Sequence, residues 1–470
     1  MANKKAWGIA GMGVMGTALS RNFASCGIEL ALFNRYVEGS EEQVASKRTQ
    51  QYSELQSAEG FESLSAFISA LEFPRKILLM LPAGAALDQF LEDLIPLLSP
   101  GDLLIDGGNS HFLDTEKRAK MLKAKKILFL GMGVSGGEKG ALEGPSLMLG
   151  GDAKAYKRVV EDLSAVAAKD SKGRACCGYL GEGGAGHFVK MVHNGIEYAE
   201  MQLLAEIVEL FHSNPNTNWV EIQKELENWQ KGENQSYLLG ITSTIMTYKD
   251  AKGPFIDNIE DRVSSKGTGA WATAIGAELG ASNSLMAAAL HARFISLSQS
   301  ERKKNASLFF QEKKESELSS ESLKRTYAVC RWINHHQGFE MLLHAQKIYG
   351  WHFKLAAVAQ LWSEGCIIKS QLMEILAEAF QTQNSIFEMT LFKNGLESDL
   401  DAWGQTLKYA VDQGVPVHCI QTAWNYWLSI TQPRGSGALL QAQRDYFGAH
   451  GFERIDDPTG VLHHGPWKKD

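Results

Sequence analysis

One segment of the chain carries the side chains best suited to acid–base chemistry. Lys190, Asn194 and Glu197 stand at positions i, i+4 and i+7, so they share one face if the segment is helical. His193 and Tyr198 flank that face. A neutral lysine can accept a proton, and a protonated glutamic acid can donate one. The spacing therefore indicates a base and an acid on a single helix.

The same spacing also occurs on ordinary surface helices. Apolar residues argue against that alternative, because Met191, Val192 and Ile196 occupy the other sides of the helix. We therefore expect a central helix over about residues 187–211. Gly195 costs about 1 kcal/mol inside a helix, which indicates that another element packs closely against it.

A glycine-rich fingerprint, GxGxxG, lies near the N-terminus. It consists of Gly11, Met12, Gly13, Val14, Met15 and Gly16. It follows an apolar run typical of a strand and opens a helical pattern. The glycines allow a tight turn, close approach of a pyrophosphate and close helix–strand packing, and the helix N-terminus supplies free N–H groups. A turn without a ligand is the alternative, which this strand–helix context disfavours.

The residues after the second expected strand select between nicotinamide coenzymes. Asn34, Arg35 and Tyr36 stand there, and none of them is an acid that would bind the ribose hydroxyls of NAD. Arg35 can pair with a 2′-phosphate and stack on adenine, which favours NADP. NAD stays possible, and a solvated surface arginine is the alternative.

Two further segments offer ligands for a small polar substrate. Asn109 lies in a Gly-Gly turn after an expected strand, at the sheet edge where α/β proteins bind ligands. Eight glycines fall between residues 131 and 151. Within them Ser135, Gly136 and Gly137 offer a hydroxyl and consecutive backbone N–H groups, which suit a carboxylate or a sugar oxygen. We expect binding rather than a plain surface loop here.

Four basic residues further along are candidate phosphate ligands: Lys266, Arg293, Arg444 and His450. Taken singly, each is more often a solvated charge.

The elements that must position these residues fall into two classes. Expected strands cover residues 5–10, 29–33, 76–81, 102–106 and 127–132, with helical patterns such as 14–24 and 87–98 between them. This alternation predicts an α/β domain with a parallel sheet. From Gly181 to about residue 430 we expect only helices. The last stretch has little apolar patterning of its own, and its aromatic residues suggest that it docks on another surface. We therefore divide the chain into residues 1–182, 183–432 and 433–470.

Composition narrows the class of protein. The chain has 470 residues, 47 basic and 54 acidic, and its formal charge of −7 argues against a nucleic-acid-binding protein. We expect no membrane span, because no apolar stretch is long enough. Six cysteines without CxxC or zinc spacing indicate reduced thiols, no metal site and a cytoplasmic protein.

These motifs, in this order and spacing, resemble those of the decarboxylating 6-phosphogluconate dehydrogenases. The resemblance runs from the Gly11 fingerprint to the tail, and five segments carry it: IDGGNSHF at 105–112, GVSGG at 133–137, GHFVKMVHNGIEY at 186–198, KGTG at 266–269 and RDYFGAH at 444–450. It implies a Rossmann-like coenzyme domain, a large all-helical domain and a C-terminal tail. It also implies a homodimer whose tail threads into the partner subunit.

The resemblance implies a role for each candidate. Lys190 would be the general base and Glu197 the general acid. The sugar acid would be held by Asn109, Ser135, Gly136, Gly137, His193, Asn194 and Tyr198. Its phosphate would be bound by Lys266 and Arg293, joined by Arg444 and His450 from the other chain. The coenzyme would contact the glycine fingerprint, Asn34, Arg35, Tyr36, Leu81, Pro82, Ala83 and Asn109. Tyr36, Leu81, Pro82 and Ala270 depart from the residues usual in the family.

The implied reaction is oxidative decarboxylation of 6-phosphogluconate to ribulose 5-phosphate and CO2, with reduction of NADP. Lys190 would take the proton of the C3 hydroxyl of the substrate. After CO2 has left, Glu197 would protonate C1 of the enediol, which gives ribulose 5-phosphate. Two alternatives stay open: another β-hydroxyacid dehydrogenase, or a non-catalytic nucleotide-binding protein. The phosphate candidates disfavour the first, and the Lys190–Glu197 pair disfavours the second.

Overall fold

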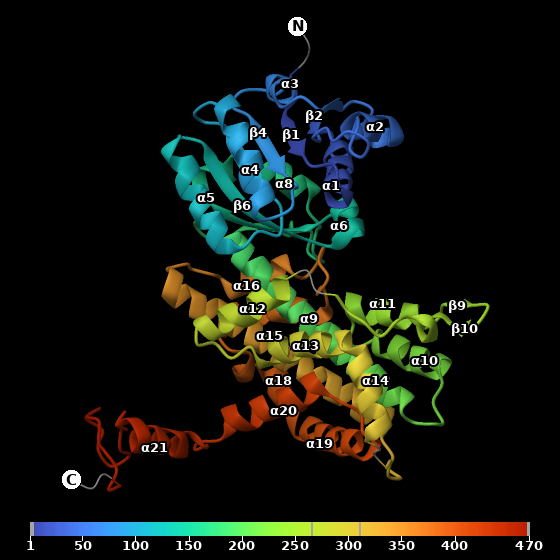
Figure 1. Ribbon diagram of the computed structural model, residues 1–470, viewed down its shortest axis with the longest axis vertical. Coiled ribbons are helices and arrows are strands. Elements are labelled where there is room, and N and C mark those ends of the chain that lie inside the picture. The colour runs from blue at the N-terminus through green and yellow to red at the C-terminus, as the bar shows by residue number, and fades with distance from the viewer. Residues whose placement is uncertain (1–3, 265–266, 310–311, 468–470) are drawn as a thin grey trace.

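The computed structural model describes residues 4–264, 267–309 and 312–467. Strands alternate with helices over the first 180 residues, and helices dominate the rest of the described chain. In Figure 1 the sheet-containing part lies above the helical part, and the C-terminal tail projects at the lower left. The predicted fold class, an α/β Rossmann-like part followed by a large helical part and a tail, is confirmed.

Among the described residues, eight strands form one sheet in the order β3-β2-β1-β4-β5-β6-β7-β8. Neighbouring strands run parallel except β6 and β7, which are antiparallel. Their bounds are β1 Trp7–Ala10, β2 Leu30–Phe33, β3 Glu59–Phe61, β4 Lys76–Leu79, β5 Leu103–Asp106, β6 Leu128–Ser135, β7 Ser146–Gly151 and β8 Cys177–Tyr179. The five expected strands are present. The sequence analysis missed β3, β7 and β8, which are short or rich in glycine.

Helices cover both faces of this sheet because its strands are apolar on both sides. Leu78 of β4 packs in a core that includes residues of α1 and α8, whereas its neighbours Ile77 and Leu79 pack in a core with residues of α3, α4 and α5. The helices are α1 Val14–Ser25, α2 Val44–Gln51, α3 Leu64–Ser69, α4 Ala85–Leu94, α5 Phe112–Ala124, α6 Gly137–Glu143, α7 Ala153–Lys157 and α8 Val160–Val166.

The helical part is built around α9, whose 28 residues are mostly buried. It begins near the sheet and runs into the centre of the helical part (Figure 1). The helices are α9 Ala185–His212, α10 Trp219–Trp229, α11 Tyr237–Ile245, α12 Thr268–Glu278, α13 Ser284–Leu297, α14 Gln299–Leu308, α15 Ser320–Tyr349, α16 Leu355–Leu361, α17 Gln371–Ala379, α18 Thr390–Asn394, α19 Leu396–Gln413, α20 His418–Thr431 and α21 Gly437–Gly448. Among the described residues, no helix is long and apolar enough to cross a bilayer.

The expectation of helices alone between residues 181 and 430 is wrong at one place. Two-residue strands β9 (Lys249–Asp250) and β10 (Gly253–Pro254) form an antiparallel hairpin. Strands this short carry too little alternation to be recognised from sequence.

Glycines let α9 lie directly on the sheet. A Cβ at Gly133 would lie 2.4 Å from Lys190 Cβ, and one at Gly186 would lie 2.5 Å from the carbonyl oxygen of Met148. Strands β6 and β7 thus contact the α9 backbone with no side chain between them. Several glycines of the stretch 131–151 are therefore packing positions in β6 and β7, and the binding role expected of Ser135, Gly136 and Gly137 stays a prediction.

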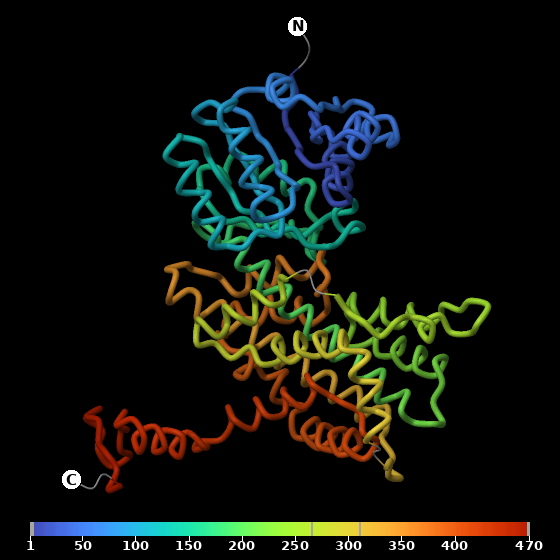
Figure 2. The backbone as a smooth tube through the Cα atoms, viewed as in Figure 1, coloured from blue at the N-terminus to red at the C-terminus, as the bar shows by residue number. Residues whose placement is uncertain are grey.

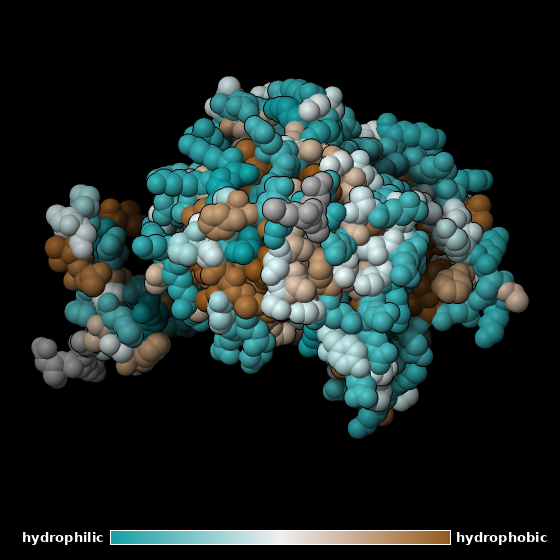
Figure 3. Space-filling view, turned by 90° about the horizontal axis from the view of Figure 1, so that it is seen from above, coloured by the Kyte–Doolittle hydropathy of each residue, from teal (hydrophilic) through white to brown (hydrophobic). Residues whose placement is uncertain are grey.

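The tail has its own small fold, although its sequence lacks an apolar pattern. After α21 the chain turns back around the buried carboxylate of Asp445, which accepts hydrogen bonds from the backbone N–H groups of Gly451 and Gly465 and from the side chains of His464 and Trp467. Figure 2 shows this unit projecting away from the helical part. Its surface is rich in exposed large side chains: Leu439, Leu440, Tyr446, Phe447 and Ile455. Figure 3 shows brown, hydrophobic atoms on this unit at the left.

Candidate active site

Four neighbouring parallel strands, β2, β1, β4 and β5, end at one edge of the sheet. The loops that follow them carry the predicted coenzyme residues: 11–16 after β1, 34–36 after β2, 81–83 after β4 and Asn109 after β5. Residues distant in sequence are therefore brought to the same edge of the sheet, the edge at which open α/β sheets bind ligands.

The glycine fingerprint has the shape that a pyrophosphate needs. Gly11 has φ +98°, and a Cβ there would lie 2.4 Å from the carbonyl oxygen of Met80. A Cβ at Gly16 would lie 1.8 Å from the carbonyl oxygen of Gly11. At Gly13 a Cβ would meet nothing within 4 Å, and no side chain caps α1 there. Gly11 and Gly16 are thus needed for close packing, whereas Gly13 leaves the N-terminus of α1 open to a ligand.

The side chains after β2 are arranged differently from the expectation. Asn34 is buried, and its Oδ1 accepts the N–H of Met12 at 3.0 Å, which ties this position to the fingerprint. Arg35 is 71 % exposed, as an anion ligand should be, but its Nη2 lies 3.0 Å from Glu41 Oε1. None of the three residues after β2 is an acid, but a turn brings the acid Glu41 back to Arg35. Tyr36 is 55 % exposed.

The turn after β5 is stabilised by hydrogen bonds to Asp106, the last residue of that strand. The buried carboxylate of Asp106 accepts the N–H of Gly108 at 3.0 Å and the hydroxyl of Ser110 at 2.6 Å. Asn109, between them, is exposed at the sheet edge. Asp106 thereby presents Asn109 to ligands without facing them itself.

Lys190 lies at the centre of a buried polar cluster. Its Nζ donates to Asn194 Oδ1 at 2.7 Å and to Ser135 Oγ at 3.3 Å, and lies 3.2 Å from His193 Nδ1. His193 Nε2 lies 3.1 Å from Ser135 Oγ. His193 Nδ1 is also 3.6 Å from Glu197 Oε2, so the histidine stands between the lysine and the glutamate.

Burial sets the protonation of this cluster. It lowers the pKa of Lys190, an effect that the charge of Glu197 partly opposes. It raises the pKa of the Glu197 carboxyl, against the nearby charges of Lys190 and Arg293. The pKa of His193 is pushed well below its ordinary value by burial and then by Lys190. A neutral His193 that accepts from Lys190 and donates to Ser135 fits these contacts.

The neighbouring face of α9 meets α12 and α13. Arg293 Cζ lies 3.5 Å from the centroid of the Tyr198 ring, which brings the guanidinium beside the Glu197 side of the cluster. A Cβ at Gly195 would lie 2.5 Å from Met286 Sδ and 3.0 Å from Ala272 Cβ. The expected close packing at Gly195 is confirmed. Lys266 lies outside the described residues.

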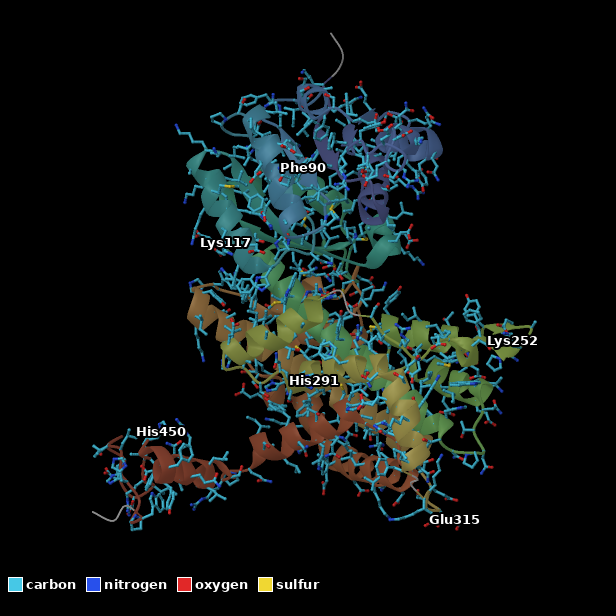
Figure 4. All side chains as sticks on the ribbon, in the orientation of Figure 1. Phe90, Lys117, Lys252, His291, Glu315 and His450 are labelled. Atoms are coloured by element: carbon cyan, nitrogen blue, oxygen red, sulfur yellow. The ribbon has the colours of Figure 1, made fainter. Side chains whose placement is uncertain are left out.

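The remaining substrate candidates divide into two groups. Gly136 and Gly137, both with positive φ, lie where β6 passes into α6, directly after Ser135. Arg444 and His450 lie in the projecting tail, and Arg444 donates to its own helix neighbour Gln441. Figure 4 labels His450 on the tail and His291 on α13, and the two are far apart within one chain. One chain therefore assembles the lysine cluster but not the tail residues.

Two family models together match nearly the whole chain. The NAD binding domain of 6-phosphogluconate dehydrogenase matches residues 6–181, and the C-terminal domain of 6-phosphogluconate dehydrogenase matches residues 186–467. The chain belongs to the 6-phosphogluconate dehydrogenase family.

Relatives of this dehydrogenase family are similar over their full length. The decarboxylating 6-phosphogluconate dehydrogenase of Haemophilus influenzae is 37 % identical, over 98 % of this chain and 96 % of its own. That of Staphylococcus aureus strain N315 is 39 % identical, over 97 % and 98 %. The solved 6-phosphogluconate dehydrogenase of Plasmodium falciparum superposes with a TM-score of 0.93 at 31 % identity, over 98 % of this chain and 100 % of its own.

Reasoning from the sequence missed two kinds of contributor to the site. One kind acts through hydrogen bonds: Asp106 accepts from the residues on either side of Asn109, and Glu41 accepts from Asn34 and Arg35. The position of Asp106 at a strand end before Gly-Gly was a usable signal, whereas Glu41 reaches its place only through a turn. Gly133 was recognised as part of a motif, but its contact with the Lys190 side chain depends on how α9 crosses the sheet.

Proposed function

We propose that this chain oxidises and decarboxylates 6-phosphogluconate to ribulose 5-phosphate and CO2, with NADP as the hydride acceptor. The single observation that carries this is the buried cluster on α9, in which Lys190 and Glu197 lie on either side of His193. The family relatives support the substrate, because the homologues of Haemophilus influenzae and Staphylococcus aureus, similar over their full length, are decarboxylating 6-phosphogluconate dehydrogenases. The solved Plasmodium relative, described in complex with NADP+ and with 6-phosphogluconate, supports the coenzyme.

Lys190 acts as the proton acceptor of the oxidation. Burial lowers its pKa, which increases the fraction of neutral lysine that can accept a proton. It takes the proton of the C3 hydroxyl, while bound NADP supplies the chemistry of accepting the hydride from C3. Ser135 and Asn194 hold the lysine Nζ through hydrogen bonds, which fixes its direction.

The same lysine serves the decarboxylation. After oxidation the sugar acid is a β-keto acid, and loss of CO2 builds negative charge on the C3 oxygen. Protonated Lys190 donates to that oxygen and stabilises the charge in a site with little water. Burial raises the pKa of Glu197, which favours its protonated form. This acid delivers its proton to C1 of the enediol while Lys190 takes back the hydroxyl proton, so that the ketone of ribulose 5-phosphate forms. The proton is removed at one carbon and a proton is delivered at another, so the reaction needs two acid–base groups.

We assign the sugar acid to Asn109, Ser135, Gly136, Gly137, His193, Asn194 and Tyr198, and its phosphate to Lys266 and Arg293. Arg444 and His450 of a second copy complete the phosphate site in a homodimer. Exposed apolar side chains on the tail support this arrangement, because a lone chain leaves Phe447 and Ile455 75 % and 86 % exposed. We propose that residues 1–182 bind the coenzyme, 183–432 the substrate, and 433–470 the partner. The six cysteines, all without disulfide partners among the described residues, support a cytoplasmic location.

The test is coenzyme reduction on 6-phosphogluconate with NADP and with NAD in parallel, while released CO2 is trapped. Reduction with one CO2 per coenzyme is the expected result. Reduction without CO2 would contradict decarboxylation and identify a simple hydroxyacid dehydrogenase. No reduction with either coenzyme would refute the enzyme proposal.

A further inference from the structure

The end of β2 holds an ion pair at the position expected to meet the adenosine ribose. Arg35 Nη2 lies 3.0 Å from Glu41 Oε1, and Asn34 Nδ2 donates to Glu41 Oε2 at 2.9 Å. Asn34 also accepts the N–H of Met12 in the glycine fingerprint. One carboxylate is therefore bonded to both polar side chains that follow β2, and through Asn34 it is connected to the coenzyme loop.

A tight turn places this carboxylate. The N–H of Val37 donates to the carbonyl oxygen of Glu41 at 3.0 Å, the N–H of Glu41 donates back to Val37 at 2.8 Å, and Gly39 takes φ +74° between them. Glu41 thus faces Arg35 although it lies six residues further along the chain. Hydrogen bonds from Arg35 and then Asn34 lower the pKa of the Glu41 carboxyl, so the group is anionic at neutral pH.

A carboxylate at this place affects the two nicotinamide coenzymes in opposite ways. An acid at the end of the second strand accepts a hydrogen bond from the ribose 2′-hydroxyl of NAD. A phosphate monoester carries a charge of about −1.5 to −2 at pH 7, so the 2′-phosphate of NADP is repelled by the same acid. NADP must also draw the Arg35 guanidinium away from an existing partner, which reduces its net gain.

We propose that Glu41 is a coenzyme-selecting residue that weakens the preference of this chain for NADP over NAD. The inference rests on the proposed function only in that a nicotinamide coenzyme binds at the glycine fingerprint. Glu41 supplies the acid that is missing directly after β2, and Arg35 supplies the cation for the 2′-phosphate. The ion pair between them makes the ribose site suitable for both coenzymes.

The test is Glu41→Gln in the full-length chain, with kcat/KM measured for NADP and for NAD at saturating 6-phosphogluconate. We expect the NADP/NAD ratio to rise at least tenfold, chiefly through a lower KM for NADP, with kcat nearly unchanged. Glu42→Gln is the matched control, because it removes the same charge one residue further on, where Glu42 accepts the N–H of Gly39. We expect it to change the ratio less than twofold.

Binding of two coenzyme fragments, with and without the 2′-phosphate, measures coenzyme selection independently of turnover. Calorimetric titration with adenosine 2′,5′-bisphosphate should show at least fivefold tighter binding in Glu41→Gln, while 5′-AMP binds no more tightly than to the unchanged chain. An unchanged coenzyme ratio in Glu41→Gln, or an equal change in Glu42→Gln, would overturn the inference. If the unchanged chain turned over neither coenzyme, the proposed function would fail instead, and the fragment titrations would still decide the role of Glu41.

Discussion

Lys190 combines two demands that conflict in water. Its proposed role as proton acceptor requires a neutral amine, and it also requires hydrogen bonds that orient the nitrogen. Burial meets the first demand by lowering its pKa, and Asn194 and Ser135 meet the second. Between its folded-state pKa and its ordinary value near 10.5, the unfolded chain binds more protons at this residue than the folded chain. The buried lysine therefore costs folding stability at neutral pH, and this cost diminishes as the pH rises.

Replacement of Lys190 by methionine tests its contributions to turnover, coenzyme binding and folding stability separately. Lys190→Met should lower kcat at least a thousandfold, since both proton transfer and charge stabilisation are lost. NADP affinity should stay within about twofold, and the unfolding temperature should not fall, because the cost of the buried charge disappears. Activity assays, coenzyme titration and thermal unfolding measure the three quantities. Lys139→Met is the control, because Lys139 is 76 % exposed on α6. Activity equal to that of the unchanged chain in Lys190→Met would remove the lysine from catalysis.

The pH dependence of kcat/KM follows from the two shifted groups. Activity should fall on the acid side as Lys190 becomes protonated and on the alkaline side as Glu197 loses its proton. Because the lysine pKa is lowered and the glutamate pKa is raised, the two limbs should lie closer to neutrality than the ordinary values of 10.5 and 4.5. Glu197→Gln should lose about a hundredfold or more in kcat and should lack the alkaline limb. A Glu197→Gln profile with the same alkaline limb would assign that limb to another group.

At the scale of elements, the site depends on how closely α9 approaches the sheet. Gly133 of β6 contacts the Lys190 side chain at its base, and Gly186 of α9 lies against the backbone of β6 and β7. A side chain at either place would push the helix outward. The strands therefore determine the position of the lysine through backbone contact, in addition to the hydrogen bond that Lys190 donates to Ser135.

Gly133→Ala tests this contact. The added methyl would lie 2.4 Å from Lys190 Cβ, so helix or strand must shift, which costs about 1–3 kcal/mol of stability. We expect kcat to fall more than tenfold while coenzyme binding is retained. Gly140→Ala is the control, since its methyl would meet its nearest neighbour at 3.7 Å inside α6, and it should be neutral or slightly stabilising. Normal kcat in Gly133→Ala would show that the lysine tolerates the displacement.

The success of sequence reasoning differed between local and non-local features. The fingerprint, the expected strands and the long helix were predicted well, because each follows from residues within one segment. Three features were not predicted: the approach of α9 to β6, the turn that returns Glu41 to Arg35, and the hydrogen bonds that gather around the Asp445 carboxylate. Each of these joins residues whose proximity depends on tertiary packing or on a turn, and periodicity carries no information about either.

At the scale of the whole molecule, the tail is organised but separate. A carboxylate rather than an apolar core holds it together, and its hydrogen bonds with Gly451 and Gly465 lower the pKa of Asp445. Arg444 and His450 lie on either side of the C-terminal end of α21, close in sequence to Asp445. A unit folded in this way can present two basic side chains to a second copy without needing that copy to form its own turns.

Complementation tests the sharing of the tail. Deletion of residues 433–470 should abolish turnover while leaving coenzyme binding at the sheet intact, and full-length Arg293→Ala should be severely impaired. Mixed under conditions that allow subunit exchange, the two chains should recover about a quarter of normal activity, since half of random dimers carry one complete site. Native mass measurement confirms that hybrids form. Hybrids without recovered activity would contradict a shared site.

The direct seating of α9 on the sheet has a mechanical consequence. Lys190 is near the start of the helix, where Gly133 and Gly186 pack it directly against β6 and β7 of the sheet. Glu197 lies seven residues further, about 10 Å along the axis, where α12 and α13 surround it. A small rocking of one half of the molecule against the other would bend the helix between these points. Under the proposed assignment, the proton acceptor would then move with the sheet-containing half, and the proton donor with the half that carries Arg293.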